Sequence, residues 1–268
     1  MVRMCAVSYL NTKPFIAGLE RYFRPTELDL QLLIPSACGE HFAQHKVDFG
    51  LVPVGSLAGM PEVHLLNNYC IGADGEVDSV FLFARKPLSH IRRVYLDGHS
   101  RSSNNLTRIL FRKHWQQAVE YRKEPDYFGK IKGEAAGVVI GERAVALRNE
   151  FKVVIDLAAA WKEWTGLPFT FAVWAYHPRQ FPALFRDRLY KALTWGMQNL
   201  PKVAERYASM AGYSPKYLLD YYRHRIDYRF DEAKHFALEL YLKELCSLEG
   251  LTPPAVHLDQ PVVFRGIS

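Results

Sequence analysis

The chain has 268 residues, of which 49% are hydrophobic and 23% are charged, as is ordinary for a globular protein. No apolar run approaches the about 18 residues that a membrane-spanning helix needs, so we expect no membrane partner. The four cysteines are scattered without a CxxC pair, which argues against a disulfide framework or a zinc knuckle. Strand-like sequence begins by Met4 and leaves no room for a secretory signal, so we expect a cytoplasmic protein with reduced thiols.

The formal net charge of +6 gives the molecule a positive field that favours anionic partners. Basic residues are spread along the chain, and their densest stretch runs from Arg101 to Lys123. No recognised nucleic-acid-binding motif accompanies them. We therefore expect a small anionic ligand and no nucleic acid.

Strand and helix patterns alternate from the start of the chain, which predicts an α/β protein with mainly parallel strands. In the first part of the chain, the predicted strands cover 4–7, 28–34, 48–54 and 78–84, and the predicted helices cover 14–23 and 39–44. The last of these strands is apolar on both faces after its first two residues. This pattern is typical of a central strand that is covered on both sides.

The alternation restarts after Pro87. The next predicted strands cover 94–96, 137–140, 153–156 and 168–176, and helices are predicted after residue 103 as far as about 117, over 142–148 and around Trp161 and Trp164. The last third of the chain has helical spacing instead, with an N-cap at Asp231. Its aromatic stripes indicate packing helices rather than cofactor contacts.

Two long apolar strands, near 78–84 and 169–176, bracket a self-contained α/β unit. This arrangement predicts two lobes. Residues 1–85 and 177–268 would form one discontinuous lobe, and residues 86–176 would form the inserted second lobe. Two chain crossovers between the lobes would make a hinge beside a cleft.

The most informative segment runs from Val7 to Phe15 and predicts a strand, a polar corner and a helix. Pro14 suits the first turn of a helix, where its missing N–H group is not needed. Ser8, Tyr9 and Asn11 would present hydrogen-bonding groups at the carboxyl end of the strand, where open α/β sheets bind ligands. The competing interpretation is a plain helix cap and turn.

A second polar turn, Ser100-Arg101-Ser102-Ser103, opens a predicted helix. Hydroxyls, a guanidinium and unpaired N–H groups together suit a carboxylate or a phosphate. The alternative is a serine N-cap followed by an arginine that faces solvent.

Four further residues are candidates for the cleft. Ser79 begins a central strand, where hydroxyls are uncommon, and Ser56 ends the corner after 48–54. Gly141 allows a ligand to approach the backbone closely. Phe169 belongs to an aromatic group that would wall a ring-shaped ligand or simply fill the core. Three roles remain open for Glu142, the residue after Gly141: a catalytic acid, a charge at the helix N-terminus, or an ion-pair partner for a lysine.

Other chemistries have no support in the sequence. His41 and His45 have the i, i+4 spacing of metal ligands on a helix, but no third ligand or HExxH pattern accompanies them, so we predict no metal site. The sequence contains no GxGxxG, Walker A or GxSxG pattern. We therefore predict no nucleotide or redox cofactor.

Six segments in order resemble one enzyme family. They are VSYLNTKP at 7–14, GLVP at 50–53, DSV at 78–80, SRSS at 100–103, IGERA at 140–144 and the stretch from Asp156–Leu157 to WTGLPF at 164–169. Together they resemble the chorismate dehydratases of the futalosine route to menaquinone, over about residues 3–175. Two positions depart from the family pattern, which more often has Thr at Ser102 and Asp at Glu142.

The resemblance implies a two-lobed periplasmic-binding-protein-like fold of type 2, with an interlobe cleft and a helical C-terminal part. It implies conversion of chorismate, a dicarboxylate, to 3-[(1-carboxyvinyl)oxy]benzoate and water. Asn11 and Ser79 would be catalytic, with Asn11 orienting the substrate or bonding the departing oxygen. Arg101 and its neighbouring serines would hold one carboxylate, and Ser8, Ser56 and Ser79 the other.

Two other functions remain open from the sequence. One is a binding protein of the same fold that takes a small acid and releases it unchanged. The other is the sibling enzyme of the pathway, 1,4-dihydroxy-6-naphthoate synthase, whose opening resembles Cys-Pro-Asn-Asp-Thr where this chain has Tyr-Leu-Asn-Thr-Lys.

Overall fold

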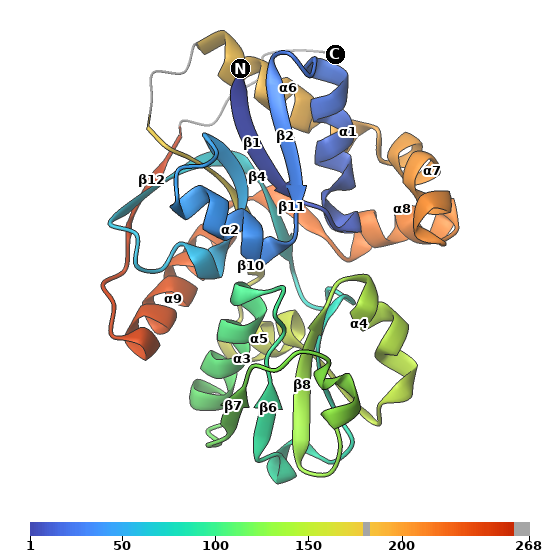
Figure 1. Cartoon of the computed structure of the whole chain (residues 1–268), viewed down its shortest axis with the longest axis vertical. Coiled ribbons are helices and arrows are strands. Elements are labelled where there is room, and N and C mark those ends of the chain that lie inside the picture. Colours follow the sequence, from blue (N-terminus) through green and yellow to red (C-terminus); the bar gives the residue numbers. More distant parts are fainter. Residues whose placement is uncertain (179–182, 260–268) are drawn as a thin grey trace.

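Two separate β-sheets divide the molecule into two lobes (Figure 1). The computed structural model describes residues 1–178 and 183–259, so parts of the predicted segment 177–268 lie outside the described residues. Among the described residues, the larger sheet has seven strands: β1 (Val2–Val7), β2 (Leu28–Leu33), β3 (Phe49–Pro53), β4 (Glu62–Ala73), β10 (Phe169–Tyr176), β11 (Asp227–Phe230) and β12 (Ala255–Leu258). Their order is β11-β4-β10-β3-β1-β2, and β12 pairs with β4.

The smaller sheet carries the second lobe. Its five strands are β5 (Val80–Ala84), β6 (Arg93–Tyr95), β7 (Glu120–Arg122), β8 (Ala135–Ile140) and β9 (Val153–Asp156), in the order β7-β6-β8-β5-β9. Every residue of β5 and β8 is buried, as expected for strands covered on both faces.

Nine α-helices surround the sheets in the described part of the chain: α1 (Lys13–Tyr22), α2 (Pro35–Ala43), α3 (Arg101–Lys113), α4 (Glu142–Leu147), α5 (Leu157–Thr165), α6 (Ala183–Gln198), α7 (Leu200–Ala211), α8 (Pro215–His224) and α9 (Glu232–Glu249). Short 3-10 turns are η1 (Leu10–Thr12), η2 (Val54–Ser56), η3 (Leu88–His90), η4 (Tyr127–Lys130) and η5 (Arg148–Glu150). No helix within the described residues combines the length and the apolar character that crossing a bilayer requires.

Both sheets are mixed, whereas the sequence pattern predicted mainly parallel strands. The first strands of the larger sheet are parallel, but β10 runs antiparallel to both of its neighbours, β3 and β4. In the smaller sheet β5 is likewise antiparallel to β8 and β9. Strands β5 and β10 are the first strands after the chain passes from one lobe to the other. Each of them joins the sheet of its lobe antiparallel to its neighbours. The twelve-residue strand β4 was not predicted.

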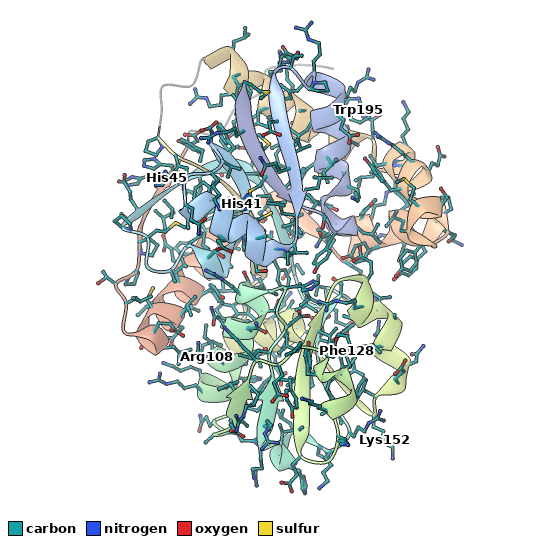
Figure 2. The ribbon with its side chains drawn as sticks, viewed as in Figure 1. His41, His45, Arg108, Phe128, Lys152 and Trp195 are labelled. Carbon is teal, nitrogen blue, oxygen red and sulfur yellow. The ribbon has the colours of Figure 1, made fainter. Side chains whose placement is uncertain are left out.

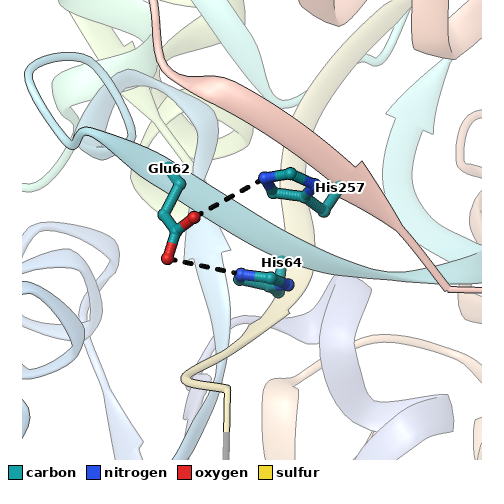
Figure 3. Close-up of side chains that lie close together, drawn as sticks. All are labelled: Glu62, His64 and His257. Carbon is teal, nitrogen blue, oxygen red and sulfur yellow. Dashed lines mark ion pairs between the residues drawn. The ribbon is translucent and has the colours of Figure 1, made fainter.

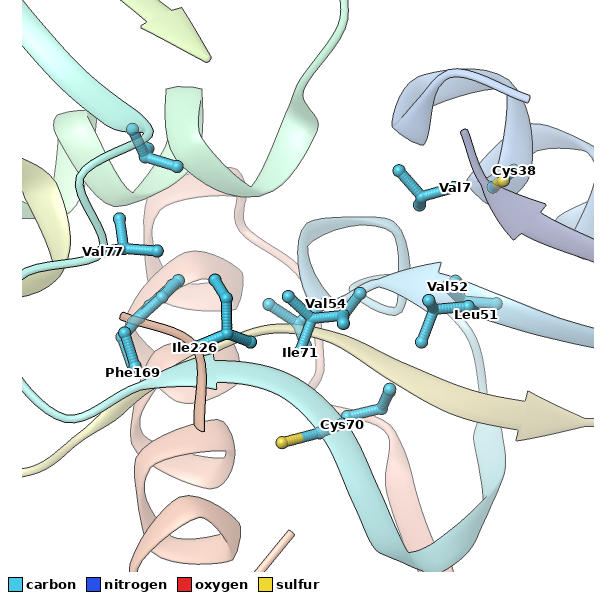
Figure 4. Packing of buried hydrophobic residues seen from close by; sticks show 14 of the residues in the cluster. Val7, Cys38, Leu51, Val52, Val54, Cys70, Ile71, Val77, Phe169 and Ile226 are labelled. Atoms are coloured by element: carbon cyan, nitrogen blue, oxygen red, sulfur yellow. The ribbon is translucent and has the colours of Figure 1, made fainter. Parts of the chain in front are cut away.

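We propose that the lobes divide at residues 74–79 and 166–168, each one strand earlier than predicted from the sequence. The reason is that 80–84 pair in the smaller sheet and 169–176 pair in the larger one. Figure 4 shows the apolar residues that pack where the chain crosses between the lobes, among them Val54, Val77 and Ile226. Figure 2 shows His41 and His45 on the larger lobe and Arg108 on the smaller one.

Candidate functional site

A cavity of about 530 Å³, partly open to solvent, lies where the two lobes meet. Its polar lining is neutral and comes from both lobes: Tyr9, Asn11, Thr12, Ser79, Ser100, Ser102 and Ser103. Its apolar lining includes Val7, Ile71 and Val77, whose packing is seen in Figure 4. Among the described residues that line this cavity, none carries a charge. A ligand here would therefore be held by hydroxyls, amides and backbone groups rather than by ion pairs.

The N-terminal corner forms one wall of the cavity. Strand β1 ends at Val7, the 3-10 turn η1 carries Asn11, and Pro14 lies in the first turn of α1, as the sequence predicted. The Asn11 carbonyl accepts a hydrogen bond from the Tyr228 hydroxyl at 2.8 Å. The Asn11 side-chain oxygen accepts one from the Thr12 hydroxyl at 3.2 Å. Its amide nitrogen has no hydrogen bond within the described chain, so this N–H₂ group is free to donate to a ligand.

Tyr9 links the corner to the smaller lobe. Its hydroxyl lies 3.0 Å from Nδ1 of His99, which precedes α3. Burial raises the pKa of Tyr9, and nearby Arg143 only partly opposes this, so the phenol is neutral at physiological pH. Arg143 itself is paired with the buried Asp97 at 2.8 Å. Tyr9 can therefore act as a hydrogen-bond donor but not as a base.

The start of α3 forms the opposite wall, and its serines already have structural partners. Ser100 is the N-cap of α3 and accepts a hydrogen bond from the Ser103 amide. The Ser102 hydroxyl accepts from the Gly55 amide at 3.0 Å and donates to the Phe171 carbonyl at 3.2 Å. Gly55 is required here because a Cβ atom would lie 2.8 Å from the Ser102 nitrogen. The wall is thus fixed to the larger lobe before any ligand binds.

Arg101 does not contribute to this cavity, contrary to the prediction from the sequence. It is the first residue of α3 and is exposed, and it faces a separate outer hollow that includes Arg108 and Glu249. A residue next to the N-cap lies on a different face of the helix from Ser102 and Ser103, which point into the cavity. Ser100 is thus a helix cap that also lines the cavity, and Arg101 faces solvent.

Ser79 and Gly141 lie together at the hinge. The Ser79 hydroxyl is 3.0 Å from the Tyr221 hydroxyl, and the Ser79 carbonyl accepts from the Gly141 amide at 2.8 Å. Gly141 has φ 69° and ψ −153°, a conformation that is essentially restricted to glycine. Burial raises the pKa of Tyr221, so this phenol is also neutral. The hydroxyls of Ser79 and Tyr221 share a hollow with Asn11.

Asp156 holds the hinge segment that leads into Ser79. One of its carboxylate oxygens accepts from the amides of Val77 and Asp78 at 2.9 and 2.8 Å, and the other caps α5. Burial raises the pKa of Asp156 to about 6, although the hydrogen bonds that its carboxylate accepts from four backbone N–H groups oppose this shift. This carboxylate therefore ties Val77 and Asp78, where the chain crosses between the lobes, to strand β9 of the smaller sheet.

A second, smaller chamber of about 320 Å³ adjoins the cavity. Both are lined by Tyr9, Asn11, Ser79 and Gly141, so these residues stand between the two chambers. The second chamber adds Glu142, whose carboxylate accepts a hydrogen bond from the Leu10 amide at 3.0 Å. Because Leu10 and Glu142 belong to different lobes, this bond ties the lobes together.

Three predicted binding residues lie outside both chambers. The Ser8 amide bonds to the Leu33 carbonyl of β2. Ser56 is buried against Gly39, and Phe169 is buried in an aromatic cluster with Trp161 and Tyr241. Neither side chain faces the cavity.

Phe171 lines the cavity in place of Phe169. The pairing of β10 with β4 shifts register between Thr170 and Ala172, and this bulge re-aims the Phe171 side chain. Tyr221 and Tyr228 were also missed, because they come from the C-terminal third and reach the corner only in the folded chain. Their positions in the sequence gave no signal beyond general aromatic content.

Lys13, directly before Pro14, brings a cation to the corner. It is half-buried at the start of α1, and burial lowers its pKa while Glu142 and Glu20 oppose the shift. Its ammonium lies 5.5 Å from the centre of the Tyr207 ring. Lys13 therefore adds positive potential behind the corner without lining the chambers.

Comparisons with known proteins agree with this architecture. The menaquinone biosynthesis family model matches residues 2–246. The chorismate dehydratase of Thermus thermophilus is 28% identical over 261 residues, covering 87% of this chain and 96% of that protein. A crystal structure of a protein from Archaeoglobus fulgidus superposes with a TM-score of 0.74 at 15% identity, covering 93% of this chain and 97% of the other.

The fold is also shared with a Candida albicans protein described as having the generic periplasmic binding protein fold. The TM-score is 0.64 at 9% identity, covering 98% of this chain and 99% of that one. The two-lobed, periplasmic-binding-protein-like α/β fold predicted from the sequence is thus confirmed. The family match extends over most of both lobes, and the chain belongs to the menaquinone biosynthesis family.

Proposed function

We propose that this chain is a hydro-lyase that converts chorismate to 3-[(1-carboxyvinyl)oxy]benzoate and water. The observation that carries the proposal is the neutral, hydroxyl-lined cavity between the lobes, in a chain whose family match spans 2–246. The similarity to a chorismate dehydratase supports the choice of substrate.

One carboxylate of chorismate would bind at the start of α3. This helix has 13 residues, and its N-terminal end faces the cavity through Ser100, Ser102 and Ser103. The partial positive charge of a helix N-terminus stabilises an anion by up to about 2 kcal/mol where it is partly buried. The hydroxyls of Ser100 and Ser102 already donate to Ser103 Oγ and to the Phe171 carbonyl, so the Ser103 hydroxyl and the helix terminus are the groups left to hold the carboxylate.

The reaction removes a hydrogen from the ring carbon that carries the enolpyruvyl ether and the hydroxyl from the neighbouring carbon. The C–H electron pair forms the new ring double bond, the C–O bond breaks, and the ring becomes aromatic. The proton and the departing hydroxide together give one water, and no electron acceptor is required. Formation of the aromatic ring supplies much of the driving force.

The chain supplies hydrogen-bond donors to this reaction. In this proposal the amide N–H₂ group of Asn11 donates to the departing hydroxyl oxygen. Ser79, next to Asn11 and bonded to the Tyr221 hydroxyl, would orient the substrate from the hinge side. A preorganised donor aimed at a developing oxyanion lowers a barrier by about 2.7–4 kcal/mol.

The proton acceptor is the substrate's own side-chain carboxylate in this proposal. Both phenols beside Asn11 are neutral, and the Glu142 carboxylate of the second chamber is bonded to the Leu10 amide. The enolpyruvyl carboxylate lies close to the ring hydrogen within chorismate. Holding the substrate in that conformation is then the main task of the closed lobes.

Incubation of the purified chain with chorismate tests the proposal. Mass spectrometry should show a product that has lost one water and kept the enolpyruvyl group. Chorismate that binds but is recovered unchanged would support the binding-protein alternative instead. The same assay is run on Asn11→Ala, which should lose most of this conversion. Asn149→Ala, which changes an exposed asparagine, is its matched control.

A further inference from the structure

Three metal-ligating side chains meet on the larger lobe, away from the cleft: Glu62, His64 and His257 (Figure 3). Strand β12 pairs in parallel with β4, and the register sets His257 beside His64 and Ala255 beside Glu62. Alternate residues of a strand share a face, so Glu62 and His64 lie on one face of β4. The pairing of strands from opposite parts of the chain therefore assembles the group.

The distances within the group suit a shared ion better than direct hydrogen bonds. Each oxygen of the Glu62 carboxylate lies 3.6 Å from one imidazole Nε2, the first from His64 and the second from His257. This separation is too long for a hydrogen bond. The three ligand atoms all lie within 4.8 Å of one another. Two ligands of a tetrahedral zinc ion, each about 2.0–2.1 Å from the metal, are about 3.4 Å apart.

His64 provides a second, independent observation. Its Nε2 atom is shielded from solvent and has no hydrogen-bond partner in the described part of the chain. A buried polar atom without a partner is costly and is uncommon in folded proteins. Figure 3 shows this nitrogen and that of His257 both directed toward the Glu62 carboxylate. The two rings are stacked with their centres 4.7 Å apart and their planes 17° apart, so a cation would satisfy all three groups after a small rotation of the rings toward it.

The exposure of the group allows an ion to enter and to keep a water ligand. The side chains of Glu62 and His257 are 53% and 52% exposed, and that of His64 is 21% exposed. Two imidazoles and one carboxylate suit borderline divalent transition ions such as Zn²⁺, and three protein ligands leave one position open. None of the three residues lines either chamber of the cleft.

We propose that Glu62, His64 and His257 form a site for a divalent transition-metal ion, with Zn²⁺ as the best-suited probe. The ion would fasten β12 to β4, next to the hydrogen bond of 2.6 Å between the Tyr176 hydroxyl and Asp259. The site departs from the prediction of no metal, which considered only His41 and His45. Helix α2 ends at Ala43, so those two histidines do not share a helix.

Equilibrium dialysis with Zn²⁺ tests the site on the full chain prepared without a histidine tag. The wild-type chain should bind one equivalent. The His257→Ala and Glu62→Gln variants should bind more than about tenfold more weakly, since losing even an outer-shell partner costs about 10–100-fold. His224→Ala, which removes another exposed histidine, is the matched control and should bind as the wild type does.

A second measurement separates a built site from scattered surface binding. Zn²⁺ should raise the melting temperature of the wild-type chain and of His224→Ala, but not that of His257→Ala, because only ligands of the native state stabilise it. Chorismate turnover by His257→Ala should equal that of the wild type, so this test stands apart from the proposed reaction. Equal Zn²⁺ affinity in the wild type and His257→Ala would overturn the proposal.

Discussion

The two walls of the cleft present similar polar groups but use them differently. At the start of α3, Ser100 caps its helix and Ser102 is bonded to both Gly55 and Phe171. At the N-terminal corner, Asn11 is held through its carbonyl and its side-chain oxygen, and its amide N–H₂ group has no hydrogen-bond partner within residues 1–178 and 183–259. In the proposed reaction the α3 wall would therefore bind the substrate, and the corner would supply the donor that acts on it.

This contrast explains how a cavity without charged lining can serve a dianionic substrate. Fixed hydroxyls and a helix terminus bind charge without the desolvation cost of a buried ion pair. A single uncommitted donor can then be aimed at the atom whose charge changes. Substitutions on the corner should therefore reduce turnover, and substitutions on the α3 wall should reduce stability and binding.

The largest effect is expected at the corner. Asn11→Ala should lower kcat by about 10²–10³-fold, because a donor that acts in the transition state is lost, and should change KM little. Steady-state kinetics with chorismate measures both values, with Asn149→Ala as control. A variant whose KM rises while kcat is kept would show that the corner only binds substrate, and the contrast between the walls would fail.

The next largest effect is expected at the hinge between the walls, where the free energy of unfolding should depend on pH. Because the pKa of Asp156 rises from 3.8 to about 6 on folding, the folded chain binds this proton more tightly than the unfolded chain. The stabilisation is present below about pH 4 and is lost as the pH rises through about 6. The unfolding free energy of the wild type minus that of Asp156→Asn should thus fall by about 2 kcal/mol between about pH 4 and 7.

Urea unfolding at several pH values measures this difference. Asp187→Asn, which changes an exposed carboxylate, should give a difference that stays flat over the same range. If the difference for Asp156→Asn instead rises with pH, the four hydrogen bonds from backbone N–H groups lower the pKa of Asp156 more than burial raises it. The hinge would then hold an ionised carboxylate.

On the α3 wall, Ser102→Ala should destabilise the protein by about 1–3 kcal/mol. It removes the acceptor of the buried Gly55 amide and leaves that N–H group without a partner. Chemical denaturation measures the loss, and Ser209→Ala on the exposed face of α7 is the control. A variant with full stability but a hundredfold lower kcat would reverse the roles of the two walls.

The smallest effect is expected at the bond between the lobes. Glu142→Ala loses the acceptor of the Leu10 amide, a contribution of about 1 kcal/mol, and should raise KM several-fold by loosening closure. Glu142→Gln keeps an acceptor oxygen and should behave nearly as the wild type does in the same assay. If the glutamine variant instead loses turnover as strongly as Asn11→Ala, Glu142 takes part in proton transfer and the substrate carboxylate is not the base.

Local signals made the corner and the hinge predictable from the sequence. The strand before Ser8, the proline in the first helical turn and the glycine at 141 each have a local backbone cause. These signals depend on residues close together in the chain. They placed Asn11 and Gly141 at the carboxyl ends of strands and Ser79 at the start of one. The structure brings the three together because β5 runs antiparallel to β8.

Other features depend on contacts that no local pattern contains. The outward direction of Arg101 follows from the rotation of α3 about its axis, and the choice of Phe171 over Phe169 follows from a bulge in β10. Tyr221 and Tyr228 reach the site only through the return of the C-terminal third. The metal-ligating group likewise requires the register of β12 on β4.

Dehydration of chorismate by this chain can be followed by proton NMR after incubation with the purified protein and no added cofactor. We expect new aromatic ring signals together with the retained methylene signals of the enolpyruvyl group, and loss of this conversion in Asn11→Ala but not in Asn149→Ala. Recovery of unchanged chorismate, or an aromatic product formed with release of pyruvate, would contradict the proposed dehydration.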